Sequence, residues 1–134
     1  MKEEIRTLIK YRLDRAYESL EEAKILLEKG HTNTFVNRLY YGCFYAVSAL
    51  LLTRGLSSSK HSGIRSLFHK TFVKTGVAKV ELGQVYDKLF DTRQKGDYTD
   101  FVQFEVKEVS NWYEEAKEFV ETIEKLVKKE MAKA

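Results

Sequence analysis

The sequence predicts an all-α protein: an antiparallel bundle of the four-helix type with one additional short helix, five helices in total. Composition supports this class, because the 134 residues include no proline and only seven glycines, and most of the others favour or tolerate helix. Apolar residues also recur every three or four positions along most of the chain. The stretches between these periodic segments are short, so we expect a single domain covering residues 1–134.

The first helix is predicted over residues 3–28, where one face is apolar and the other is charged. Gly30 is placed to end it in the left-handed conformation, and Thr32 or Asn33 can cap the helix that follows. That second helix runs to about residue 54. Its apolar residues cover most of its circumference, so it should be the central helix of the bundle, with Cys43 in the core.

Three further helices complete the predicted bundle. The third is short and begins after Ser58 or Ser59, either of which can cap it. The fourth spans about residues 79–95 and carries an apolar stripe. The fifth starts after Asp100, whose position three residues before Gln103 resembles a capping box.

Nothing in the sequence indicates export or a membrane. The amino terminus carries charge throughout and lacks the continuous apolar region of a signal peptide. The longest mostly apolar run, LYYGCFYAVSALLL, is shorter than the roughly 20 residues that span a bilayer. The single cysteine cannot form an internal disulfide, which suits a reducing compartment. We therefore expect a soluble, cytoplasmic protein with no membrane contact.

Charge is distributed unevenly along the chain, although the formal net charge is only +3. No acidic residue lies between Glu28 and Glu81, and the basic residues of that segment are Lys29, Arg38, Arg54, Lys60, Arg65, Lys70, Lys74 and Lys79. A positive field of this kind attracts phosphate-bearing ligands and acidic proteins alike. We therefore expect the partner to be RNA, a nucleotide or an acidic protein. Lys60 and Arg65 are candidate ligand-binding residues.

The stretch DTRQKGDYTDF holds a candidate site, because Arg93, Asp97 and Tyr98 fall within six positions of it. Arg93 can hold a phosphate or form an ion pair with Asp97 or Asp91. Asp97 can act as a base, orient Arg93 or serve as a turn residue after the glycine. Tyr98 can contact a phosphate or a base, or it can pack at the start of the next helix.

Strictly alternating helix directions place the end of the second helix, the start of the third and the end of the fourth at one end of the bundle. His61 is therefore expected near the candidate site. It could supply a base there. With Arg65 and His69 it forms a basic stripe at every fourth residue, and the alternatives are a solvated face or a helix-capping histidine. Arg38 and Tyr41 share a face of the second helix far from that end, where Arg38 either reaches the rim or lines a pocket.

Three segments in order, NRLYYGCFYAVSALLLTRG, KHSG and LFDTRQKGDY, give the chain a resemblance to the HEPN domain superfamily of prokaryotes, and within it to a small stand-alone subfamily. The resemblance covers nearly the whole chain. It implies a helical bundle that commonly dimerises and that is frequently partnered by a small nucleotidyltransferase, as in toxin and antitoxin pairs. It also implies, for many members, a metal-independent endoribonuclease activity.

That activity relies in the superfamily on an arginine and a histidine separated by four to six residues. Arg93 matches the arginine, whereas the positions open to the histidine hold Tyr98, Thr99 and Asp100. A neutral imidazole accepts the proton of an RNA 2′-hydroxyl far better than tyrosine does. The resemblance therefore supports the expected fold and partners more strongly than it supports catalytic activity.

Two functions from different classes follow from these observations. The first is a dimeric RNA- or nucleotide-associated interaction module of a toxin-antitoxin or nucleotidyltransferase-linked system. The alternative is a metal-independent endoribonuclease that uses Arg93 with His61 or Asp97 in place of the missing histidine. A weaker third is a nucleotide pocket at Arg38 and Tyr41. No cofactor or metal is predicted, and a homodimer is expected because the second helix presents more aromatic residues than one bundle covers: Tyr40, Tyr41, Phe44 and Tyr45.

Overall fold

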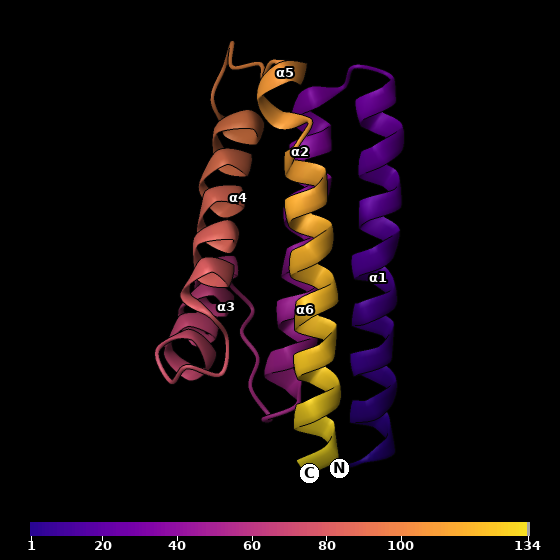
Figure 1. Ribbon diagram of the computed structural model, residues 1–134, viewed down its shortest axis with the longest axis vertical. Helices are drawn as coiled ribbons and strands as arrows, with labels where there is room; N and C mark the ends of the chain where they lie inside the picture. The colour runs from indigo at the N-terminus through magenta and orange to yellow at the C-terminus, as the bar shows by residue number, and fades with distance from the viewer. Residues whose placement is uncertain (134) are drawn as a thin grey trace.

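The computed structural model describes residues 1–133 and consists of helices joined by short connections. They are α1 (Glu3–Glu28), α2 (Thr32–Leu52), α3 (His61–Phe68), a π-helical turn η1 (His69–Val73), α4 (Val80–Tyr98), the one-turn α5 (Val106–Val109) and α6 (Trp112–Lys133). The four long helices α1, α2, α4 and α6 alternate in direction, so the start of α1 and the end of α6 lie at the same end (Figure 1). The predicted all-α bundle with an additional short helix is confirmed.

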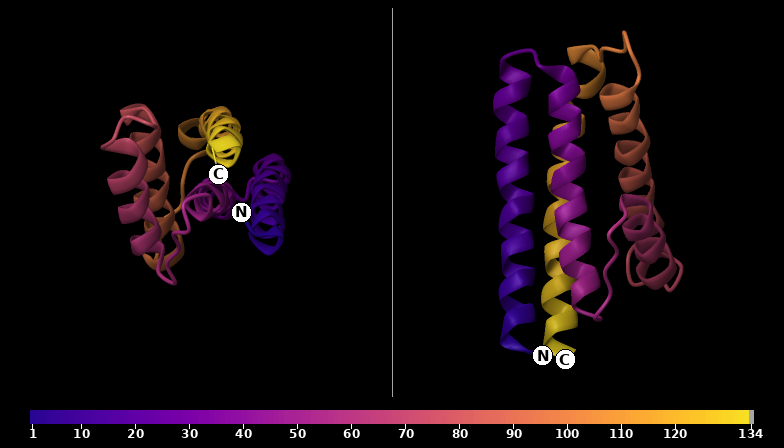
Figure 2. Two further views of the ribbon diagram at one scale, coloured as in Figure 1. Left: turned by 90° about the horizontal axis from the view of Figure 1, so that it is seen from below. Right: turned by 180° about the vertical axis from the view of Figure 1, so that it is seen from behind.

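Helix α2 is the centre of the bundle, as its sequence predicted. It packs against α1, α4 and α6 (Figure 2), and Cys43 is fully buried in the core. Gly42 allows α1 to approach closely, because a Cβ there would lie 3.1 Å from the Leu20 side chain. By length and composition α2 could cross a membrane, the one such helix in residues 1–133, but 67% of its most apolar window is buried inside the bundle. A core helix of a soluble protein shows the same burial.

Thr32 and Asn33, the first residues of α2, form hydrogen bonds to the loop at residues 102–104. They do not cap their own helix, so the predicted cap is wrong. Thr32 Oγ1 donates to the Phe104 carbonyl at 2.6 Å. Asn33 Nδ2 donates to the Val102 carbonyl at 2.8 Å, and Asn33 Oδ1 accepts from the Phe104 backbone N–H at 3.1 Å. Helix α3 also begins without the predicted serine cap. Thr32 and Asn33 make tertiary hydrogen bonds in place of the predicted cap, whereas Ser58 Oγ accepts from the backbone N–H of Lys60, just before α3.

The two boundaries around the candidate site lie further along the chain than predicted. Helix α4 continues through Gly96 to Tyr98, so Gly96 is a helical residue and not part of a turn. A Cβ at Gly96 would lie 2.7 Å from the Phe104 ring, so close packing accounts for the glycine. The predicted helix start after Asp100 is also wrong, because residues 99–105 are irregular and lead into α5 and α6.

The short helix changes which helix ends meet. Residues 53–60 run back along α2, so α3 begins against the middle of α2, and α4 then lies antiparallel to α2 (Figure 2). The end of α4 therefore meets the start of α2, where Asn37 Nδ2 donates to Asp97 Oδ2 at 2.8 Å. Our prediction that the end of α2 lies beside the end of α4 is wrong, because α3 does not traverse the bundle. Arg38 is consequently near the candidate site and not far from it.

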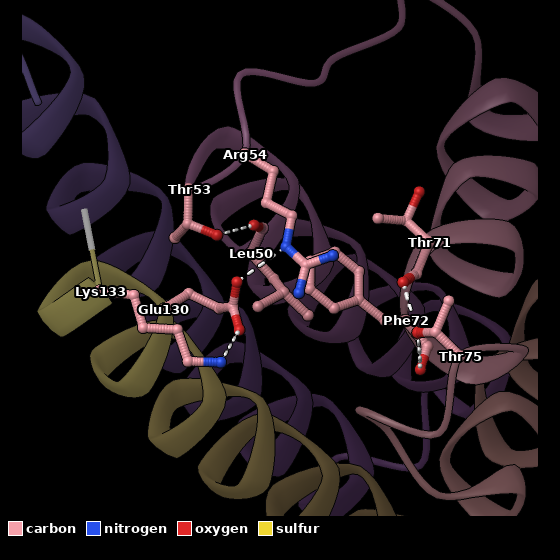
Figure 3. Close-up of polar contacts among 8 residues, drawn as sticks. All are labelled: Leu50, Thr53, Arg54, Thr71, Phe72, Thr75, Glu130 and Lys133. Carbon is pink, nitrogen blue, oxygen red and sulfur yellow. Dashed lines mark hydrogen bonds and ion pairs between the residues drawn. The ribbon is translucent and has the colours of Figure 1, made fainter.

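An ion pair joins the ends of α2 and α6 (Figure 3). Arg54 Nε donates to Glu130 Oε1 at 2.7 Å, and the guanidinium carbon lies 4.6 Å from the centroid of the Phe72 ring. Lys133 Nζ donates to the other oxygen of Glu130 at 3.4 Å. Glu130 is 7% exposed, and its hydrogen bond from Arg54 is the main cause of a pKa below the ordinary value. We call these residues the Arg54 clamp.

Candidate functional site

Arg93 is the central residue of the candidate site. It occupies an inward position of α4, and only 5% of it is exposed. Its guanidinium carbon lies 4.4 Å from the centroid of the Tyr40 ring. Its ion-pair partner Asp97 is 3.6 Å away, and its buried Nε has no hydrogen-bond partner in the described part of the chain. Burial of a charge is costly when its donors are unsatisfied. Arg93 therefore retains donor capacity for an incoming acceptor.

His61 meets Arg93 through a shared neighbour, Tyr40. The His61 Nδ1 atom lies 2.7 Å from the Tyr40 hydroxyl, and the imidazole stacks on Phe44 with ring centroids 4.3 Å apart. Burial, and secondly the charge of Arg93, lower the pKa of His61 below its ordinary value, so the imidazole is neutral near pH 7. Burial raises the pKa of Tyr40 to about 12, so its phenol stays protonated. We call Arg93, Tyr40, His61 and Asp97 the Arg93 cluster.

Asp97 lies in the last turn of α4 and contacts the neighbouring residues of the cluster. Its carboxylate accepts a hydrogen bond from Asn37 on α2 and faces Arg93 four residues earlier on the same helix. Orientation of Arg93 is therefore the role that this geometry supports, since Asp97 is helical and does not form a turn. Tyr98 does not pack as an anchor for the next helix, because it is 75% exposed with its ring centroid 5.8 Å from the guanidinium carbon of Arg93.

Arg38 and Tyr41 border the same cluster. The Arg38 guanidinium carbon lies 4.7 Å from the Tyr41 centroid, and Arg93 is 5.9 Å from the same ring. Arg38 is paired at the rim, with Glu22 at 3.3 Å and with the Asn37 side-chain carbonyl at 2.9 Å. The third predicted site is thus an extension of the Arg93 cluster along α2.

The basic stripe of α3 lies beside α4, and two of its residues contact carboxylates of that helix. Arg65 lies 3.3 Å from Asp91, and His69 Nε2 lies 2.9 Å from Asp87. His61 faces α2 through Tyr40, as described above. The acidic residues of α4 therefore offset much of the charge that the sequence assigned to Arg65 as a free ligand-binding residue.

Exposed lysines of the basic segment carry positive charge that no nearby carboxylate offsets. Lys60, Lys70 and Lys74 are exposed, and none has a carboxylate within 4.0 Å in residues 1–133. Lys70 and Lys74 line an open groove with Arg65 and His69 beside α4. Uncompensated lysines beside a groove suit polyanions, which gain from counterion release on binding.

Sequence reasoning missed Tyr40 and Asn37 as members of the site. Tyr40 was interpreted as an exposed aromatic at a dimer surface, whereas it is fully buried. A buried tyrosine needs a hydrogen-bond partner for its hydroxyl. This requirement is the one feature of the sequence from which a contact between Tyr40 and a histidine could have been predicted. In residues 1–133, no three side chains of His, Cys, Asp or Glu lie together as a metal site.

The sequence of this chain is similar to a known domain family and to several known proteins. Residues 9–126 match the HEPN domain. A Thermotoga maritima protein named "UPF0332 protein" is 48% identical over 120 residues, 90% of this chain and 91% of that protein. A Methanocaldococcus jannaschii protein named "Putative toxin" is 38% identical over 128 residues, 96% of this chain and 92% of that protein. A second protein of that name and organism is 35% identical over 96 residues, 72% of this chain and 65% of that protein.

Proposed function

Because the chain belongs to the HEPN domain family, we propose that it is an RNA-associated module of the toxin-antitoxin type whose Arg93 cluster contacts the RNA. The two relatives named as toxins support the type of system. The observation that carries the proposal is the incomplete satisfaction of Arg93, whose Nε has no partner and whose carboxylate neighbour is 3.6 Å away. A phosphate accepts two hydrogen bonds from one guanidinium, which matches this unused capacity.

The surroundings of Arg93 suit a single-stranded RNA. Tyr98 lies over the guanidinium and is mostly exposed, so its ring can move aside and stack on an unpaired base. The uncompensated Lys60, Lys70 and Lys74 attract the RNA backbone toward this side of the molecule. Binding should therefore weaken steeply with salt.

The proposed assembly is a homodimer with a small nucleotidyltransferase as a further partner. Tyr41, Phe44 and Tyr45 are only partly covered on α2, next to the Arg93 cluster, so a second copy would bury them. Light scattering well above micromolar concentration should report a dimer, and a monomer would contradict this part of the proposal. If a neighbouring gene encodes a small nucleotidyltransferase, co-purification of the two proteins tests the second partner.

RNA binding is best tested with a labelled single-stranded RNA of mixed sequence and fluorescence anisotropy. Arg93→Ala should weaken binding at least about tenfold, or 1.4 kcal/mol, since a charge-assisted contact to phosphate is lost. Lys95→Ala is the matched control, because it removes one exposed positive charge from the same helix two residues away. If both variants weaken binding equally, only general charge matters and the cluster is not the site.

The second candidate is a metal-independent endoribonuclease, and the observation that favours it is the position of the His61 imidazole, 2.7 Å from the hydroxyl of the same Tyr40 over which Arg93 lies. When Nδ1 carries the hydrogen and donates to Tyr40, Nε2 is left free to accept a proton. His61 would take the proton of a 2′-hydroxyl, and the 2′-oxygen would attack the adjacent phosphorus. The bond to the 5′-oxygen then breaks, that oxygen takes up a proton from solvent water, and a 2′,3′-cyclic phosphate remains. Arg93 would stabilise the charge that develops on the phosphate.

Cleavage assays separate the two candidates. An enzyme should lose similar activity in His61→Ala and Arg93→Ala, and its rate should rise with pH as His61 deprotonates, below the ordinary histidine value of 6.5. Cleavage that survives both substitutions comes from a contaminating nuclease. A folded wild-type protein that binds RNA without cleaving it is a binding module.

A further inference from the structure

Helices α4 and α6 leave an apolar groove of about 420 Å³ between them, on the acidic part of the chain. Its apolar lining consists of Val77, Leu82, Val85, Phe119 and Leu126. Both helices pack mainly on α2 and only weakly on each other (Figure 2). The groove is therefore a direct consequence of placing α2 at the centre.

The groove has a rigid floor and a partly exposed edge. Phe119 is 1% exposed, and its ring centroid lies 6.0 Å from that of Tyr86 and 6.1 Å from that of Phe68. Leu82, Val85 and Leu126, which also line the groove, are only partly buried. A fixed apolar floor with partly exposed apolar residues at its margin is typical of a protein interaction site.

The rim of the groove is acidic. Glu81, Glu115 and Glu118 line it, and Lys79 is its one basic lining residue. Glu115 is paired with Lys88, but Glu81 and Glu118 have no basic side chain within 4.0 Å in the described part of the chain. Two unneutralised carboxylates beside an apolar floor favour a partner that is both apolar and positively charged.

We propose that the α4–α6 groove binds a basic amphipathic helix of a partner protein. The apolar stripe of that helix would lie on Phe119 and Leu82, and its Lys or Arg residues would face Glu81 and Glu118. From Glu115 to Leu126 the groove follows α6 for about 16 Å, which matches roughly three helical turns. This surface is independent of RNA contact at the Arg93 cluster, so either proposal can fail without the other.

A second copy of this chain does not offer such a helix. The basic segment between Glu28 and Glu81 contains α2 and α3, which already pack into its own core through residues such as Phe35, Leu39 and Phe68. A helix from another protein is therefore the occupant that charge and burial favour.

The test uses the full-length protein and two labelled synthetic peptides of about 18 residues, each with a leucine stripe at helical spacing. One carries Lys at its polar positions and the other carries Glu. Fluorescence anisotropy should show that the Lys peptide binds at least about tenfold more tightly than the Glu peptide. The single tryptophan, Trp112, provides a second signal, because Lys88 lies over its ring and also holds Glu115 at the groove.

Groove variants locate the binding. Glu118→Lys and Val85→Gln should each weaken the Lys peptide several-fold, whereas Glu121→Lys, which makes the same charge change on α6 outside the groove lining, should not. Circular dichroism checks that each variant is folded. Equal binding of the two peptides, no binding of either, or an equal effect of Glu121→Lys would overturn the proposal. A change of oligomeric state in the groove variants would identify a second copy as the occupant and would also overturn it.

Discussion

Among the arginines that lie over aromatic rings, Arg54 and Arg93 differ in what their hydrogen-bond donors do. Arg54 lies 4.6 Å from the Phe72 centroid and donates from Nε to Glu130 at 2.7 Å. Arg93 lies 4.4 Å from the Tyr40 centroid, but its carboxylate neighbour is 3.6 Å away and its Nε has no partner. The stacking is the same and the hydrogen bonding is not.

The difference separates a structural arginine from a candidate functional one. In the Arg54 clamp the carboxylate is the more buried partner, and the arginine and a lysine satisfy it. In the Arg93 cluster the arginine is the buried partner and is left partly unsatisfied. A protein gains stability from the first arrangement and loses some by the second, so the second is better explained by a ligand.

The largest change in stability is expected for the Arg54 clamp. Glu130→Ala should lower the free energy of unfolding by about 2 to 3 kcal/mol, because it breaks a mostly buried ion pair and removes a contact between α2 and α6. Urea unfolding followed by circular dichroism measures this. RNA affinity of the folded variant should be unchanged, and a large loss of affinity would show that the clamp and the cluster are coupled.

At the Arg93 cluster we expect a small change in stability and a large change in RNA affinity. Arg93→Met keeps most of the aliphatic stem against Tyr40 and removes the charge, so stability should change by no more than about 1 kcal/mol. RNA affinity should fall by at least about tenfold. A stability loss as large as that of Glu130→Ala would mean that Arg93 is a structural residue like Arg54.

Tyr40→Phe tests the link between His61 and Arg93. The ring under Arg93 remains, while the 2.7 Å hydrogen bond to His61 is lost, at a cost of about 1 kcal/mol of stability. If the protein cleaves RNA, the rate should also fall, because the imidazole is no longer oriented. RNA affinity should be nearly the same as wild type, since the guanidinium is untouched. A variant that loses binding but not stability would show that the hydroxyl itself contacts RNA.

The smallest effect is a pair of pH-dependent steps in stability. The pKa of His61 is lowered in the folded state, so the unfolded chain protonates first and stability falls as pH drops below about 6.5. The pKa of Glu130 is lowered too, so a second loss begins below about 4.5. Thermal melts across this range should lose the first step in His61→Asn and the second in Glu130→Gln. A variant that keeps its step contradicts the assignment.

The helices could be predicted from the sequence because helical periodicity is local. The stripe of α1, the apolar circumference of α2 and the burial of Cys43 each follow from neighbours within a few turns. The positions of Arg93, Asp97 and Tyr98 within six residues likewise identified a candidate site before any fold was known.

Contacts between distant residues were decided only by the tertiary structure. Because α3 is too short to cross the bundle, α4 lies antiparallel to α2, and this arrangement brings Asn37 to Asp97 and Arg93 to Tyr40. The close packing that leaves no room for a Cβ at Gly96 comes from Phe104, a residue of the following loop. Local periodicity sets which residues a helix turns inward, whereas the lengths of the connections and the packing of side chains decide which of those residues meet.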